Sequence, residues 1–392
     1  MSGRDVLITG IGLVSCLGEG AETHQRLLSS GEARPVVDTE RFPPFPIHPL
    51  PAIDWNLQIP KRGDQRQMET WQRLGTYAAG LALDDAGIKG DEALCASMDM
   101  IVGASGGERD VAVDADILAQ SRLRPDVEVL LNEKLTTDLR PTLFLAQLSN
   151  LLAGNISIVH KVTGSSRTFM GEEGSGIAAI ETAAARIRAG QATHVLVGAA
   201  YQTEHPDMLL GFELGGYLHR EPHASVWKRA GMEGGGVVSG SGAAFLVLES
   251  RDHAAGRGRK AYAELGKIAS GRARRGTALE PALAAMLQEM GADKADLVVS
   301  GASGAHEPTA AEAAVLQRLG LPVRGWSTLA GHLRDAQFPF SVALAALAVG
   351  EGVAYPSSDD LERPVDGAVE TVLATTVGYH YFEGMALVTA AK

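Results

Sequence analysis

The chain has 392 residues, 45% of them hydrophobic and 21% charged, which is typical of a soluble globular protein. Its formal net charge of −12 argues against a general nucleic-acid binder, because such a protein needs a basic surface. The two cysteines, Cys16 and Cys95, cannot build a disulfide framework and lack the spacing of metal ligands. No metal site is therefore expected.

The N-terminal sequence, MSGRDVLITG, has early charges and no long apolar stretch, unlike a secretory signal. The longest apolar run, Phe340–Val349, is too short to span a bilayer. Together with the two cysteines, these features predict a soluble cytoplasmic protein without a membrane span.

Strand-like and helix-like patterns alternate through the first half of the chain. The run VLITGIG at 6–12 predicts a buried strand, and Gln67–Ile88 predicts an amphipathic helix. Residues 110–140 are charged and helical, and we expect them to form a peripheral excursion, whereas 202–236 are rich in loops. Strands are also predicted at Met98–Gly103, Asn155–Val162, Thr168–Gly171, Thr193–Gly198 and Val237–Leu248, and helices at Leu143–Leu152 and Gly174–Ala189.

The second half repeats the scheme. Strands are predicted at Tyr262–Ser270, Leu297–Ser300, Thr371–Thr375 and Met385–Ala390, and helices at Leu279–Met290, Thr309–Leu319 and Ser341–Val349. This alternation predicts α/β layers. The similar element order in 1–255 and 256–392 predicts a fold with two internally duplicated halves.

Several segments, in order, resemble the β-ketoacyl-carrier-protein synthase family, and the resemblance covers nearly the whole chain. They are VLITGIGLVSCLGEG, GDQRQMETWQRLGTYAAGLALDDAGI, NLLAGNISIVHKVTGSS, GIAAIETAAARIRAGQATHVLVGAA, SGSGAAFLVLE, AYAELGKIASG and STLAGHLRDAQFPF. The resemblance implies a thiolase-like αβαβα fold of five layers that works as a dimer.

The family's chemistry, as the resemblance implies it, needs a cysteine thiolate at the start of a buried helix to carry the acyl chain. Two histidines and a lysine organise malonyl decarboxylation, and backbone N–H groups form an oxyanion hole. A phosphopantetheine arm arrives on an acyl carrier protein, so the chain needs no cofactor of its own.

This sequence departs from that pattern at most of these positions. Aligning on RIRAG at 186–190 places Glu173 at the nucleophile position, where a carboxylate cannot form the family's thioester. Counting back from Glu312 places Gly301 where the first histidine would stand, and the lysine position is Ser327. The second histidine corresponds to His332. The glycine-rich closing motif corresponds to Tyr379–Gly384, which is bulky instead.

The sequence therefore predicts a non-condensing partner subunit that resembles a chain-length factor. It would pair with a catalytic synthase, as a heterodimer, in fatty-acyl or polyketide-type chain elongation; a homodimer is the other possibility. The region around 167–172 would lie near that interface. One alternative is a malonyl-carrier-protein decarboxylase. Another is a weakly active 3-oxoacyl-carrier-protein synthase that recruits Cys16 or Cys95.

Individual residues allow simpler interpretations as well. Glu173 is either a helix N-terminal acid, stabilised by about 0.3–1 kcal/mol, or a buried partner of His332 or of the Tyr379–Gly384 loop. His332 is interpreted as a core histidine kept for its hydrogen bonds. A group of basic residues forms either solvated loops or a docking site for an acidic carrier protein. The residues of this group named as docking candidates are Arg257, Arg259, Lys260, Arg272, Arg274 and Arg275.

Overall fold

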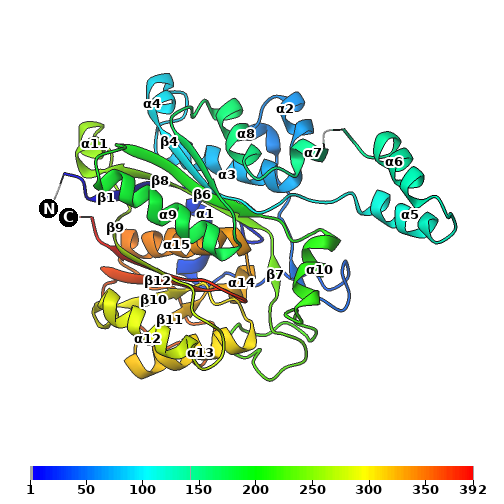
Figure 1. Ribbon diagram of the computed structural model, residues 1–392. Helices are drawn as coiled ribbons and strands as arrows, with labels where there is room; N and C mark the ends of the chain where they lie inside the picture. Colours follow the sequence, from blue (N-terminus) through cyan, green and yellow to red (C-terminus); the bar gives the residue numbers. More distant parts are fainter. Residues whose placement is uncertain (1–2, 142, 392) are drawn as a thin grey trace.

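The computed structural model describes residues 3–141 and 143–391. Its elements form five α-β-α-β-α layers (Figure 1). Helices α3 (Thr70–Asp85) and α8 (Leu151–His160) cover one outer face. Helices α12 (Leu279–Met290) and α13 (His306–Leu319) cover the other. The predicted five-layer α/β fold is confirmed.

One continuous sheet supplies both β layers. Its strands are β1 (Val6–Ser15), β2 (Gly18–Glu19), β4 (Asp99–Gly103), β5 (Ser166–Phe169), β6 (His194–Tyr201), β8 (Gly242–Ser250), β9 (Ala263–Gly271), β10 (Leu297–Ser300), β11 (Val323–Gly325), β12 (Thr371–Val377) and β13 (Glu383–Thr389). A separate short pair joins β3 (Ile47–His48) to β7 (Ser239–Gly240). The two layers are connected where β1 pairs with β9 in antiparallel register.

The two halves of this sheet have the same topology. The first has the order β5-β4-β6-β8-β1, and the second has the order β11-β10-β12-β13-β9. In each half the first three strands are parallel, and the last two pair antiparallel. This repeat is the duplication that the element order predicts. The proposed boundary between 255 and 256 falls inside α11 (Arg251–Gly256) and stays a prediction.

Two central helices, α9 (Glu173–Arg188) and α15 (Gln337–Glu351), lie between the β layers. From Phe338 to Val349, α15 is buried all round, as expected for a helix that is apolar on every face. A Cβ at Gly176 of α9 would lie 2.3 Å from the Asp335 carbonyl oxygen. Only glycine allows this approach, which brings the start of α9 against the chain that leads into α15.

The remaining helices are shorter or peripheral. They are α1 (Ala21–Ser30), α2 (Arg62–Gln67), α4 (Glu92–Ser97), α5 (Val111–Ser121), α6 (Val127–Thr137), α7 (Leu143–Ala146), α10 (Pro206–Leu214), α11 and α14 (Ser327–Ala330). Helices α5 and α6 project from the body as a hairpin, within the peripheral excursion predicted at 110–140 (Figure 1).

One predicted strand is wrong. Residues 155–160 belong to α8, and 161–162 follow it without regular structure, although NISIV alternates like a strand. Leu152, Ile156 and His160 recur every four residues, and all are buried on one helix face. This period outweighs the two-residue alternation. The loop-rich stretch 202–236 also contains α10, which begins with Pro206 at its first turn.

Candidate functional site

Glu173 is the first residue of α9, and its side chain is completely buried. Its Oε1 atom lies 2.9 Å from Nε2 of His332, which is equally buried. The same oxygen accepts a hydrogen bond of 3.0 Å from the backbone N–H of Tyr379. The structure thus brings together the residues at the nucleophile position and at the second histidine position.

Burial opposes ionisation of Glu173. The His332 imidazole and the backbone N–H groups of Glu173 and Tyr379 outweigh that effect, so the pKa of Glu173 lies below its ordinary value. The start of a helix also favours a negative charge. The result is a carboxylate fixed by its neighbours.

His332 is held by its backbone as well as by its ring. Its N–H donates to the Val238 carbonyl at 2.8 Å, and its carbonyl accepts from the Gly240 N–H at 3.0 Å. The preceding Gly331 has φ +75°, and a Cβ there would lie 2.6 Å from the His48 ring. The His332 ring also makes edge contacts with Phe212 and Tyr379. His332 is therefore part of a packed aromatic cluster.

The position of the missing first histidine has no room for a side chain. A Cβ on Gly301 would lie 2.7 Å from the Ser341 Oγ and 2.9 Å from the Thr376 Oγ1. The Gln337 side chain crosses this region, donating to the Gly301 carbonyl at 3.1 Å and to the Ser327 Oγ at 2.9 Å. Its own oxygen accepts from the Leu333 N–H at 2.6 Å. One neutral amide thus links the positions of the lost histidine and the lost lysine.

The Tyr379–Gly384 loop covers Glu173. The Tyr379 hydroxyl donates to Glu172, and its ring packs on Phe212 with centroids 4.8 Å apart. Phe382 lies over the helix start, where a Cβ on Gly174 would be 2.8 Å from its ring. The bulky residues of this loop therefore act as a packed cover over the helix start.

Backbone strain gathers around the same centre. Glu172, Arg334 and Phe382 adopt φ values of +54°, +45° and +68° without being glycine. Such conformations cost on the order of 1–3 kcal/mol each and cluster at sites that the surrounding structure holds firmly. No sequence pattern predicts these conformations.

A second buried carboxylate, Asp335, lies next to this centre. It accepts hydrogen bonds from the Ser175 Oγ at 2.6 Å and the Ser105 Oγ at 2.8 Å. Burial raises its pKa, partly offset by the neighbouring Arg334. Neither Asp335 nor Gln337 was predicted from the sequence. The only sign of them in the sequence is that these two polar residues stand just before the apolar run Phe338–Val349.

A cavity of about 500 Å³ lies outside this cover, with Tyr217, Arg274, Arg275, His306, Tyr379 and Tyr381 among the residues that line it. Glu173 and His332 do not line it. Because Tyr379 borders the cavity and also binds Glu173 through its N–H, it stands between the two. The Glu173 carboxylate and the His332 imidazole thus lie behind Tyr379, completely buried, and not at the wall of this cavity.

The six basic docking candidates fall into two places. Arg272 stacks on Tyr381 at 4.8 Å, and Arg274 and Arg275 line the outer cavity. Arg257 instead lies 3.2 Å from a Glu249 oxygen, and Arg259 donates to the Thr9 carbonyl at 3.2 Å. Lys260 is exposed beside them. Docking of a carrier protein at these residues stays a prediction.

The two cysteines are buried. Burial raises the pKa of Cys16 to about 12 and raises that of Cys95 as well, so neither thiol is activated as a nucleophile.

Within residues 3–141 and 143–391, no three His, Cys, Asp or Glu side chains are grouped to hold a metal ion. No helix in that part of the chain is long and apolar enough to cross a membrane.

Comparisons with known proteins agree with the resemblance. The family described as Beta-ketoacyl synthase, N-terminal domain, matches residues 3–254. The 3-oxoacyl-(acyl-carrier-protein) synthase 2 of Vibrio cholerae is 27% identical over 274 residues, which cover 68% of this chain and 62% of that protein. The chain thus matches less than two thirds of that relative's length. The synthase of the same name from Rhizobium meliloti is 29% identical over 408 residues, covering 94% of this chain and 90% of that protein.

Solved structures give the same fold. One described as the ishigamide ketosynthase/chain length factor matches with a TM-score of 0.77 at 19% identity, covering 99% of this chain and 100% of that chain. The five layers and the duplicated sheet order are therefore those of known ketosynthase structures.

Proposed function

Because this chain belongs to the β-ketoacyl synthase family, we propose that it is a non-condensing partner subunit resembling a chain-length factor. It would pair with a catalytic synthase in fatty-acyl or polyketide-type elongation on an acyl carrier protein. The acyl chain would arrive on the carrier's phosphopantetheine arm. Two of the relatives are named as 3-oxoacyl-(acyl-carrier-protein) synthases, and these names support acyl groups on a carrier protein as the substrate class.

The observation that carries the proposal is the closed state of the nucleophile position. Glu173 is completely buried, paired with His332, and covered by Tyr379. An acyl-transfer site needs an activated nucleophile that the substrate can reach, and this centre offers a carboxylate behind a packed cover. At Gly301, the position of the family's first histidine, the neighbouring Ser341 and Thr376 side chains leave no room for an imidazole. These features favour a structural partner over an enzyme.

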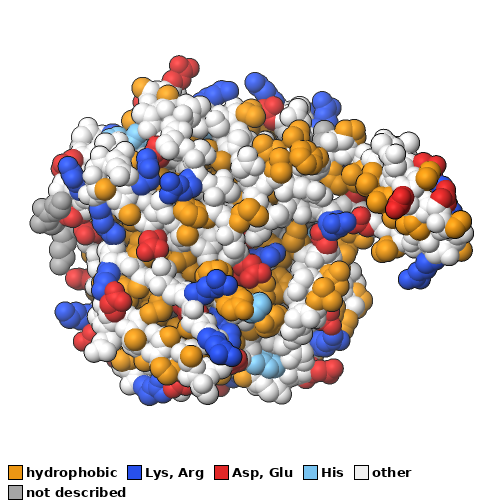
Figure 2. Space-filling view, in the orientation of Figure 1, with side chains coloured by type: hydrophobic (Ala, Val, Ile, Leu, Met, Phe, Trp, Pro, Cys, Tyr) orange, Lys and Arg blue, Asp and Glu red, His pale blue; other side chains and the backbone are white. Residues whose placement is uncertain are grey.

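Exposed apolar side chains support pairing with a second subunit. Strand β5 is the edge of its sheet, and Met170 just after it is 67% exposed. On the projecting hairpin, Leu118 and Leu123 are 64% and 84% exposed, while Leu130 is its one buried residue. Figure 2 shows hydrophobic side chains spread over this hairpin. An edge strand and apolar surface of this kind favour contact with another chain.

The test of chemistry is intact-mass analysis of malonyl-carrier protein incubated with the purified chain. We expect neither acetyl-carrier protein nor a condensed product, for the wild type and for Glu173→Gln alike. Decarboxylation that disappears in Glu173→Gln would instead identify a malonyl-carrier-protein decarboxylase. A condensed product that disappears in Cys16→Ser or Cys95→Ser would identify an active synthase.

The test of pairing is sedimentation of the chain mixed in turn with the catalytic synthases of its source organism. We expect a heterodimer with one of them, weakened by Met170→Glu. The matched control is Leu319→Glu, at a residue that is 44% exposed on α13, away from the β5 edge. A Met170→Glu variant that pairs as well as the wild type would contradict the proposed surface.

A further inference from the structure

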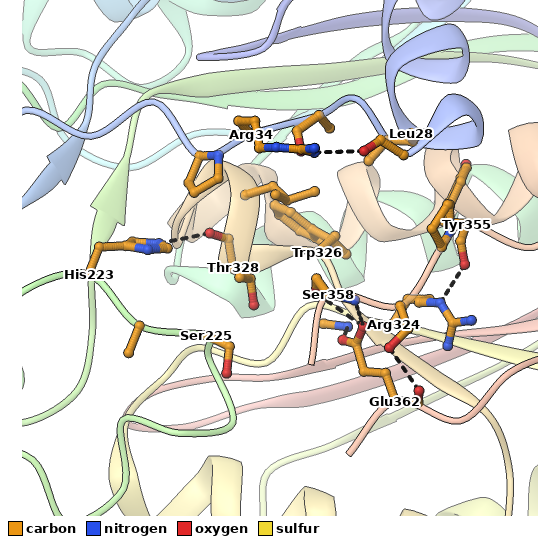
Figure 3. Close-up of a pocket in the computed structure, with 18 residues that line it drawn as sticks. Leu28, Arg34, His223, Ser225, Arg324, Trp326, Thr328, Tyr355, Ser358 and Glu362 are labelled. Atoms are coloured by element: carbon orange, nitrogen blue, oxygen red, sulfur yellow. Dashed lines mark hydrogen bonds between the residues drawn. The ribbon is translucent and has the colours of Figure 1, made fainter. Parts of the chain in front are cut away.

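A second cavity, of about 380 Å³, lies apart from Glu173 and borders α14 (Figure 3). Chain segments far apart in sequence build it, because Leu28, His223, Trp326 and Tyr355 all line it. Trp326 lies in its middle, with Arg34 on one side and Arg324 and Glu362 on the other (Figure 3). Its size and its mixture of aromatic walls with a few polar groups are typical of small-molecule sites.

Of the three charged side chains that line this cavity, two are positive, Arg34 and Arg324. Glu362 is the exception, and its two oxygens are already taken by donors from Trp227, Gly325 and Ser358. Arg324 is almost fully buried and donates through Nε and Nη1 to backbone carbonyls. Within the described residues its Nη2 has no hydrogen-bond partner. This nitrogen is not among the buried atoms without a partner in that part of the chain, so a ligand in the cavity can reach it as a donor.

A second buried cation lies directly behind the wall. Arg229 is completely buried, and its Nε donates to the carbonyl of Ala224, a residue that lines the cavity. Its Nη2 is buried without a partner, and no carboxylate of the described chain lies within 4 Å of it. Burial alone lowers its pKa to about 9. The charge of Glu362 acts on Arg324, whereas no carboxylate among the described residues offsets the effect of burial on the pKa of Arg229. With Arg34 added, the positive groups around the cavity outnumber Glu362 and give it a positive potential.

We propose that this cavity binds a small carboxylate with an apolar, preferably aromatic, body. The carboxylate would bind the free donors of Arg34, and the body would pack on Trp326, Leu28 and Tyr355. Arg324, on the far side of Trp326, would act through its positive charge. Arg34 is exposed at the cavity wall and uses Nη1 for the carbonyls of its own loop, so its other nitrogens stay available. This site is separate from the closed centre at Glu173, and it does not depend on the proposed function.

The experiment compares 3-phenylpropanoate with 3-phenylpropan-1-ol, which has the same body without the charge. Binding is followed by calorimetry and by the fluorescence of Trp326, with Trp326→Phe identifying that signal. We expect the acid to bind at least tenfold more tightly than the alcohol, and Arg34→Ala to weaken the acid about tenfold while leaving the alcohol unchanged. Ala33→Phe, which fills the cavity, should abolish binding of both.

Equal binding of acid and alcohol would overturn the proposed anion chemistry. Binding that survives Ala33→Phe, in a variant whose circular dichroism matches the wild type, would overturn the location. Absence of binding of the acid to the wild type would overturn the site itself. Arg34→Ala separates these outcomes from misfolding, because Arg34 is exposed and holds no buried group in place.

Discussion

Two buried glutamates, one in each half of the fold, differ in what surrounds them. Glu173 begins α9, with a histidine nitrogen 2.9 Å away and a backbone N–H at 3.0 Å. Glu312 lies in α13 and accepts hydrogen bonds from two neutral hydroxyls, those of Ser300 at 2.9 Å and Thr375 at 2.6 Å. Both side chains are almost entirely excluded from water.

Their ionisation differs accordingly. Burial raises the pKa of Glu312 to about 7, because the hydroxyls offset burial only in part. Burial acts on Glu173 too, yet the His332 imidazole and two backbone N–H groups reverse it and hold the pKa below the ordinary value. Burial alone therefore does not decide whether a carboxylate is charged; the neighbouring donors do. The nucleophile position holds a fixed anion, while Glu312 titrates near neutrality.

The largest effect should come from removing the imidazole beside Glu173. We expect His332→Leu to lower the free energy of unfolding by about 3–5 kcal/mol at pH 8, because it leaves a buried carboxylate unpaired. The pKa of Glu173 should rise, as for Glu312, so the variant should lose stability as pH rises. Urea unfolding at pH 5 and pH 8 measures both.

The matched control is the double variant Glu173→Gln with His332→Leu, which has no charge to leave unpaired. It should be more stable than His332→Leu alone at pH 8. Equal stability of the two variants would show that the pair contributes nothing beyond packing.

Glu312→Gln tests the other carboxylate. In the wild type the folded-state pKa is raised from about 4.5 to about 7, so the folded state favours the protonated acid. Its contribution to stability is present below pH 4.5 and is lost as pH rises to about 7, by up to about 3 kcal/mol. The Glu312→Gln variant should lack this loss. Its free energy of unfolding, relative to that of the wild type, should therefore rise as pH rises from 4.5 to about 7. Parallel urea titrations from pH 4 to pH 8 that show a constant difference would contradict this.

Gln337 offers an uncharged comparison at the start of the other central helix. Replacing it by Leu removes a partner from the Leu333 N–H and from the Gly301 carbonyl. We expect a loss of about 1–3 kcal/mol that does not change between pH 5 and pH 8, because no charge is involved. Ser327→Ala, which removes a single acceptor, should cost less. A strong pH dependence in Gln337→Leu would mean that the amide also holds the Glu173–His332 pair.

Much of this fold was predictable from the sequence because it depends on local patterns. The apolar strands, the helix at 174–189 and the apolar helix at 341–349 follow directly from periodicity and turn residues. The failure at 155–162 arose because five alternating residues match a strand as well as a helix. The duplicated topology needed only the order of the elements, which the sequence carries.

The site was predictable only in part. Alignment of motifs singled out Glu173, His332, Gly301 and Ser327, but not the amide of Gln337 that links two of these positions. Its partners are 36 and 10 residues away in sequence. Such contacts depend on how β10, α14 and α15 pack, which no local pattern encodes. The same holds for Asp335, which Ser105 reaches across 230 residues.

The smallest effect concerns one hydroxyl beside Glu312. Thr375→Val keeps the shape of the side chain but removes the 2.6 Å hydrogen bond to the carboxyl group. Because that bond favours the charged form, its loss should raise the pKa of Glu312 further. We expect a loss of about 0.5–1.5 kcal/mol at pH 5 and a larger one at pH 8, where the charged form needs the bond more. Urea unfolding at the two pH values measures this difference. If the loss is equal at both, the Thr375 hydroxyl does not act on ionisation, and burial and the Ser300 hydroxyl set the pKa of Glu312.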